Sequence, residues 1–189
     1  MAYFAALLAR NADEWRARDV DMDEVDDGMG LVEFIREACE DEEPDTAVVL
    51  LEREDAWFAV IRLDLDEDPR VFASDLAGVS RCGYADLLTA AGLVPVGPDG
   101  TPLEPFVAPD GADEPDEDPD VEAEVELDEE EYTGPSTPSG PAGDANLLAD
   151  FGQSAKDLIS LCDGRLSPAD ALAEIAGVLG AAEELEAVR

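Results

Sequence analysis

The chain of 189 residues contains no histidine, a single lysine and three cysteines, and each shortage excludes a class of protein. Without histidine the chain has neither a Ser-His-Asp nor a Cys-His catalytic group, and it lacks a main ligand of zinc sites. The cysteines, Cys39, Cys82 and Cys162, are odd in number and far apart, which argues against a disulfide framework. This usage predicts a reducing, cytoplasmic compartment.

Positive charge is scarce as well. Only 11 lysines and arginines stand against 49 aspartates and glutamates, so the formal net charge is -38. Because clustered lysine and arginine bind phosphate groups, direct binding of DNA or RNA by a basic face is excluded, and an anionic membrane surface repels the chain. No apolar run approaches the roughly 20 residues of a membrane helix, and residues 1–10 lack the basic start of a signal peptide.

The acidic residues are concentrated in the middle of the chain. Residues 95–143 are rich in Pro, Gly, Asp, Glu, Ser and Thr, and no basic residue occurs between Arg81 and Lys156. Such a segment buries too little apolar surface to offset the entropy of ordering it. We therefore predict a disordered acidic linker over 95–143, densest in charge over 110–131, that divides a unit at 1–94 from a unit at 144–189.

Apolar spacing in the first unit predicts both strands and helices. Alternate apolar residues from Trp57 to Leu63 indicate a strand, whereas Leu31, Phe34 and Ile35 follow the spacing of an amphipathic helix. Strands are expected at 2–10, 14–19, 47–51, 57–65 and 70–74, and helices at 30–39 and 84–91. This order favours an α+β fold in which an antiparallel sheet of about five strands packs against two helices.

The sequence of the last unit predicts a small group of helices. Asp144 is expected to cap a helix over 145–151, Ser154 begins a second helix, and Ser167 followed by Pro168 is a strong start signal for a third, which Gly180 interrupts. Helices of this size are marginally stable alone. We expect them to pack on each other and on either the sheet or a partner.

Two acidic motifs imitate calcium-binding loops. Asp64, Asp66 and Asp68 alternate, and Asp75 stands at the twelfth position, but Pro69 occupies the sixth position, where the loop geometry requires glycine. The run that begins at Asp19, Asp21 and Asp23 departs from the pattern at the same two places, so a solvated acidic turn is the favoured interpretation of both. No cofactor or metal is predicted. Cys39 and Cys162 are assigned to apolar helix faces, and Cys82 is interpreted as a bystander beside Arg81.

Aromatic residues offer candidates for an interface. Trp57 and Phe58 are adjacent on a predicted strand, so their rings point to opposite faces of the sheet. Aromatic side chains dominate interface hot spots, which makes this strand a candidate for partner contact. The alternative is core packing on both faces of the sheet.

The order of short motifs resembles the tRNA adenosine deaminase-associated proteins of high-GC Gram-positive bacteria. The residues that match are Tyr3-Phe4-Ala5-Ala6-Leu7-Leu8-Ala9-Arg10, Trp15-x-Ala17-Arg18-Asp19-Val20, Glu54-Asp55-Ala56-Trp57-Phe58-Ala59-Val60, Asp68-Pro69-Arg70-Val71-Phe72-x-Ser74-Asp75, Asn146-Leu147-Leu148-Ala149-Asp150 and Pro168-Ala169-Asp170-Ala171-Leu172-Ala173-Glu174-Ile175. The resemblance implies a partner, the deaminase that makes inosine at the anticodon wobble position. It implies no catalytic residue, and the chain lacks the H-x-E and P-C-x-x-C motifs of a zinc deaminase.

Charge and resemblance together favour a non-catalytic interaction protein that binds the deaminase, or another basic protein, through an acidic surface. The residues expected at the interface are Trp57, Phe58, Asp116, Glu117, Asp118, Glu129, Glu130 and Glu131. Two alternatives stay open. One is a small carboxylate-using or metal-binding protein unrelated to the deaminase, and the other is a stand-alone acidic structural protein, since acidity also serves solubility.

Overall fold

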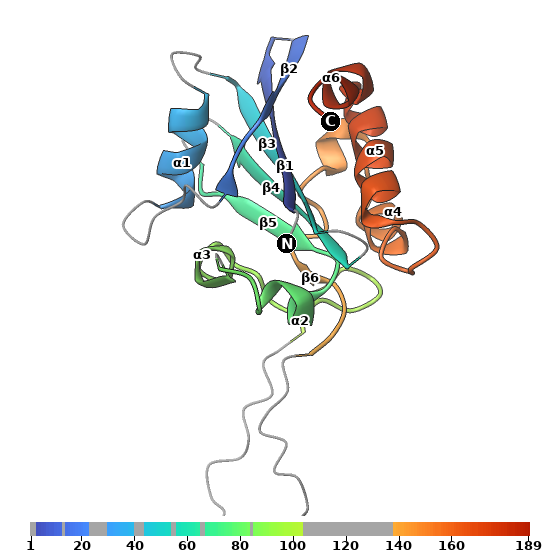
Figure 1. Ribbon diagram of the computed structural model, residues 1–189. Coiled ribbons are helices and arrows are strands. Elements are labelled where there is room, and N and C mark those ends of the chain that lie inside the picture. The colour runs from blue at the N-terminus through green and yellow to red at the C-terminus, as the bar shows by residue number, and fades with distance from the viewer. Residues whose placement is uncertain are drawn as a thin grey trace, which may run out of the picture.

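An antiparallel sheet runs through the middle of the protein in the computed structural model (Figure 1). Its strands are β1 (Tyr3–Asn11), β2 (Glu14–Asp19), β3 (Thr46–Arg53), β4 (Trp57–Asp64), β5 (Arg70–Ala73) and β6 (Ala142–Gly143), in the order β2-β1-β3-β4-β5-β6. The structure describes residues 3–12, 14–22, 30–39, 44–53, 56–64, 67–83, 85–103 and 138–189. Short connections join the antiparallel neighbours β1–β2, β3–β4 and β4–β5, whereas β6 pairs with β5 although the two are far apart in sequence.

Helices cover both faces of this sheet (Figure 1). One face carries α1 (Leu31–Ala38), α2 (Leu76–Val79) and α3 (Ala85–Ala90). The other carries a 3-10 turn (Ala149–Phe151), α4 (Ala155–Ser160), α5 (Pro168–Leu179) and α6 (Ala182–Ala187). The result is a three-layer arrangement with the sheet in the middle, and it confirms the predicted α+β class.

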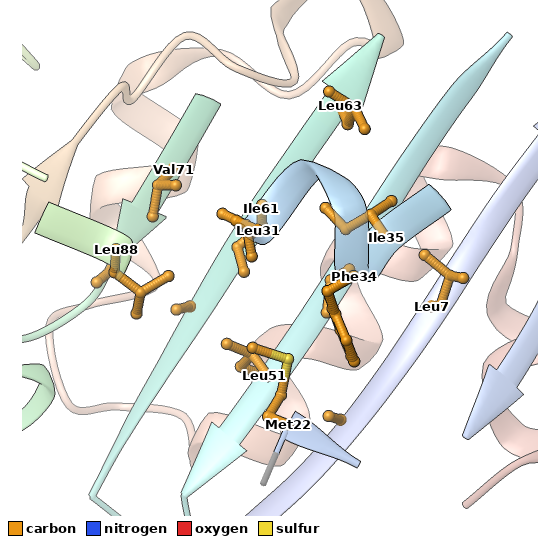
Figure 2. Close-up of a cluster of buried hydrophobic side chains, with 14 of the residues drawn as sticks. Leu7, Met22, Leu31, Phe34, Ile35, Leu51, Ile61, Leu63, Val71 and Leu88 are labelled. Carbon is orange, nitrogen blue, oxygen red and sulfur yellow. The ribbon is translucent and has the colours of Figure 1, made fainter. Parts of the chain in front are cut away.

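Strand alternation supplies a separate core to each face. On β4, Ile61 and Leu63 point to the α1 side, where they pack with the apolar side of that helix (Figure 2). Trp57 belongs to the same core. Phe58 and Val60 belong to the core on the opposite face. A strand buried on both faces reads as a continuous apolar run, which is the pattern of both β3 and β4.

The C-terminal helices pack against one face of the sheet. Phe58 and Phe72 from the sheet share one buried cluster with Leu172, Ile175 and other apolar residues of the C-terminal helices. Phe72 and Ile175 are both fully buried. Packing against a sheet supplies the apolar contact that helices of 6 to 12 residues lack when alone.

The ordered fold extends into both ends of the predicted acidic linker. Pro95 bridges to Ala142 across an antiparallel contact, and Val96 and Ala142 are buried. A side chain at Gly143, which has a φ of 99°, would overlap the carbonyl oxygen of Val71, so glycine is required where β6 approaches β5. Residues on both sides of the acidic segment therefore take part in the described fold, and residues 104–137 lie outside the described residues.

Two local predictions differ from the structure. The helix expected over 145–151 consists of turns and the 3-10 segment, because the Asp144 carboxylate accepts a hydrogen bond from Asn146 N (2.8 Å) and Gly152 ends the segment with a φ of 98°. Helix α2 was not predicted. Asp75 caps it by accepting from Gly78 N at 3.1 Å.

Candidate interaction site

A cavity of about 570 Å³ opens beside the β3–β4 connection. Its walls come from the start of β4, the end of β5, residues 139–140 and the loop between α4 and α5. The lining residues include Ala56, Ser74, Asp75, Ser139, Gly140, Leu161, Cys162, Arg165, Leu166 and Pro168. The cavity thus joins segments from four separate stretches of the chain, and it exists only because the C-terminal helices dock.

Hydrogen bonds fix the sheet side of the cavity. Ser74 N donates to Phe58 O, and Phe58 N donates to Ser74 Oγ, both at 2.9 Å. The two carboxylate oxygens of Asp75 accept from Gly78 N (3.1 Å) and Gly140 N (3.0 Å). Because its oxygens already serve backbone donors, Asp75 acts as a structural clamp between β5, α2 and the segment that returns at 138.

Helix caps fix the opposite wall. The Ser167 hydroxyl accepts from Asp170 N (3.1 Å) and donates to the Asp170 carboxylate (2.8 Å), so the α4–α5 loop ends at a defined point. Burial, together with the charge of Asp163, raises the pKa of the Cys162 thiol to about 12. The thiol in this wall is therefore neutral near pH 7 and is a poor nucleophile.

Arg165 provides the positive charge of the cavity. Its side chain is exposed, and within the described residues no hydrogen bond or ion pair engages its guanidinium. Leu166 beside it is 37% exposed, one of few large apolar side chains this open in the described part of the chain. A free guanidinium next to an exposed leucine makes this wall suited to binding an apolar group that carries a carboxylate.

A second cluster of charges lies on the C-terminal side of the sheet, around Arg62. This residue is 6% exposed, and its guanidinium contacts the carboxylates of Asp64 and Asp150 and donates to Leu147 O at 2.7 Å. The Phe151 ring lies under it, 4.7 Å from the ring centroid. Each nitrogen of the Arg62 guanidinium donates to a group of the chain itself. The cluster therefore connects the sheet to the C-terminal helices, and the Arg62 guanidinium is not available to a ligand.

The pKa shifts in this cluster have clear causes. Burial raises the pKa of Asp64, but hydrogen bonds from Thr46, Arg62 and Arg70 outweigh it and hold the pKa below the ordinary value. The hydrogen bond from Arg62 lowers the pKa of Asp150. Burial lowers the pKa of Arg62, yet its two carboxylate partners raise it overall. All three groups are charged at neutral pH.

The expected interface residues fall into two groups. Trp57 and Phe58 are 1% and 2% exposed, so both rings pack in the cores on opposite faces, as the core-packing alternative describes. Both residues are nevertheless among those that line the cavity. The acidic residues expected at the interface, Asp116, Glu117, Asp118, Glu129, Glu130 and Glu131, lie outside the described residues.

Two residues of the calcium-like run make contacts that stabilise the fold. Asp64 binds Arg62 and Arg70, and Asp75 caps α2, while Asp66 lies outside the described residues. Among the residues that the structure describes, no three potential metal ligands gather into one group. Cys82 is buried.

The sequence did not point to the cavity, since its walls come from segments far apart in the chain. One available signal was the isolated Arg165-Leu166 pair just before the cap at Ser167, in a stretch otherwise rich in acidic residues. Arg62 offers a second signal, because an arginine inside an apolar strand indicates a buried ion pair.

Comparison with known proteins gives one match. The family model for the Rv3753c-like tRNA adenosine deaminase-associated protein matches residues 3–182, which span all six strands and nearly all of the helices. No curated protein and no solved structure matches the chain. Among the described residues, no helix has the length and apolar character needed to span a bilayer. With a match over this extent, the chain belongs to the family of tRNA adenosine deaminase-associated proteins.

Proposed function

We propose that this protein is a non-catalytic partner of a tRNA adenosine deaminase and binds it through an acidic surface. The observation that carries the proposal is membership of a family named for association with that enzyme, over residues 3–182. The reaction centre would belong wholly to the deaminase. The protein would act in the cytoplasm, on the enzyme that makes wobble inosine or on another basic component of tRNA processing.

Charge supports this mode of binding. Residues 104–137 contain 15 acidic residues and no lysine or arginine, among them Asp116, Glu117, Glu129 and Glu130. A protein surface that binds tRNA is basic, because phosphate affinity comes from lysine and arginine. An acidic segment therefore complements such a surface, speeds the encounter and competes with tRNA for it.

The groups in the cavity support a binding role more than a catalytic one. Cys162 is a neutral thiol, Asp75 is occupied by backbone donors, and the chain contains no histidine that would act as a base. The motifs that hold zinc and its general base in the nucleic-acid deaminases are also missing from the sequence.

Calorimetric titration of the purified deaminase with matched variants tests the proposal. In one variant every Asp and Glu of 110–131 becomes Asn or Gln, and in its control the same 22 positions are scrambled at constant composition. We expect the neutralised variant to bind at least about tenfold more weakly at low salt, the scrambled one to bind like the natural chain, and all affinities to fall as salt rises. Equal binding by the neutralised variant would exclude the acidic segment as the contact.

A further inference from the structure

The cavity beside the β3–β4 connection offers a contact that acidity alone does not supply. We propose that it is the docking site for a segment of the deaminase that presents an apolar side chain next to a carboxylate. This inference rests on the proposed function and adds a second, chemically different contact to it.

Size and lining fit one or two inserted side chains. The volume of about 570 Å³ lies within the range of about 300–1,000 Å³ that is usual for ligand pockets. Its apolar surface comes from Ala56, Leu161, Leu166 and Pro168. The walls are held by the two hydrogen bonds between Ser74 and Phe58 and by the cap at Ser167, so the site is formed before anything binds.

Arg165 identifies the charged part of the segment. In a chain with 49 acidic residues, arginines such as Arg62, Arg70 and Arg189 pair with carboxylates of the chain itself. Arg165 has no such partner among the described residues, although it lies at the cavity. A guanidinium binds a carboxylate with two parallel hydrogen bonds, and this pairing sets both orientation and specificity.

The negative field of the chain does not prevent this pairing. At physiological ionic strength the Debye length is about 8 Å, so exposed charges farther away are largely screened. The carboxylate that lines the cavity, Asp75, already accepts hydrogen bonds from Gly78 N and Gly140 N. A ligand carboxylate can therefore pair with Arg165, and the described lining of the cavity contains no unoccupied carboxylate that would repel it.

The position of the cavity links the two contacts. Residues 104–137 rejoin the described fold at Pro138, and the next two residues, Ser139 and Gly140, line the cavity. A deaminase held by the acidic segment is thereby kept at high local concentration next to the cavity. One partner can use both contacts, its basic surface for the acidic segment and its apolar, carboxylate-bearing segment for the cavity.

Two cavity variants and one control test the site in the full chain. Arg165→Gln removes the cation, Ser139→Trp fills the opening from an exposed position, and Arg81→Gln removes another exposed arginine without a side-chain partner in the described residues. Against the purified deaminase at 150 mM salt, calorimetry should show both cavity variants binding about 5- to 30-fold more weakly, and Arg81→Gln binding within twofold of the natural chain. Unchanged melting temperatures would show that the variants fold.

Peptides identify the ligand chemistry. Fifteen-residue peptides that tile the deaminase, titrated into ¹⁵N-labelled protein, should include one that shifts the amide signals of Gly140, Gly164 and Leu166. Replacing its Asp or Glu by Asn or Gln should weaken binding to the natural chain and make no difference to Arg165→Gln, which shows direct coupling of the two groups. Equal loss in both proteins would contradict the pairing.

The outcomes separate the two proposals. If the natural chain does not bind the deaminase at all, the proposed function fails. If it binds and both cavity variants bind equally well, the proposed function stands and the docking site is overturned.

Discussion

Arg62 on β4 and Asp150 in the 3-10 turn form a two-pronged ion pair although they are 88 positions apart in sequence. Nη2 lies 2.7 Å from Oδ2, and Nη1 contacts Oδ1. Arg62 also binds Asp64, two residues along the same strand, with Nε 2.9 Å from Oδ1. The side chain of one arginine thus ties the sheet to the start of the C-terminal helices, and the position of those helices is what forms the cavity.

Removing Asp150 should loosen this junction. The Arg62 side chain is buried, whereas Asp150 is 58% exposed and Asp64 remains as a second partner. Hydrogen bonds to a charged group usually contribute about 1.5–3 kcal/mol, and the exposure of Asp150 places the loss on Asp150→Ala toward the lower end of that range. Urea unfolding measures the change. Asp163→Asn, an exposed acid in the α4–α5 loop, is the control and should stay within about 0.5 kcal/mol.

The charge cluster around Arg62 should make the free energy of unfolding depend on pH in the acid range. The folded pKa values of Asp64 and Asp150 are lowered. A group whose pKa is lower in the folded state stabilises the fold fully above its unfolded value, about 3.9, and loses this contribution as pH falls through the folded pKa. The advantage of the natural chain over an Asp64→Asn, Asp150→Asn double variant should be constant from pH 5 to 7 and shrink below pH 4.

Urea unfolding of both proteins between pH 2.5 and 7 checks this difference. Protonation of the many other carboxylates relieves repulsion in both proteins alike, so it cancels in the comparison. An advantage that persists unchanged at pH 2.5 would contradict the assignment.

The two cores should unfold together. Ile175 is fully buried against the sheet, so Ile175→Ala should cost about 2–5 kcal/mol. Trp15 and Trp57 lie in the two different cores, so single-tryptophan variants report each layer. Both reporters should show the same shifted transition, because the sheet is shared by the two cores. A shift seen by Trp15 alone would show that the C-terminal helices unfold independently.

Cys162 should react slowly with iodoacetamide. With a pKa of about 12, roughly a thousandth as much thiolate is present at pH 8 as for an ordinary thiol near 9. We expect alkylation at pH 8 to be at least about a hundredfold slower in the folded protein than in urea. Mass spectrometry of the Cys162 peptide measures the two rates. Labelling at equal rates would show that the thiol is not held in the wall of the cavity.

Local patterns predicted much of the fold. Alternation from Trp57 to Leu63 gave β4 to within one residue at its end, and the Ser167-Pro168 start and Gly180 stop gave α5. These features depend on the spacing of apolar residues and on helix caps, which a few neighbouring residues determine. The brief strand β6 was not predicted, because Ala142 and Gly143 gain their pairing only from β5.

Most of the candidate site could not be predicted from neighbouring residues in the sequence. Trp57 and Phe58 were correctly given opposite faces, but whether a helix layer covers the second face depends on docking across the whole chain. Both the pairing of Arg62 with Asp150 and the presence of Arg165 and Ser139 in the lining of one cavity require that docking. Contacts this distant in sequence are set by tertiary packing, which residue spacing does not encode.

Size-exclusion chromatography with light scattering shows whether the protein associates physically with a tRNA adenosine deaminase. The protein and its cognate deaminase are run together at low and moderate salt, with and without tRNA. We expect a co-eluting complex that weakens as salt rises and that tRNA displaces. Separate elution of the two proteins at both salt concentrations would contradict the proposed association.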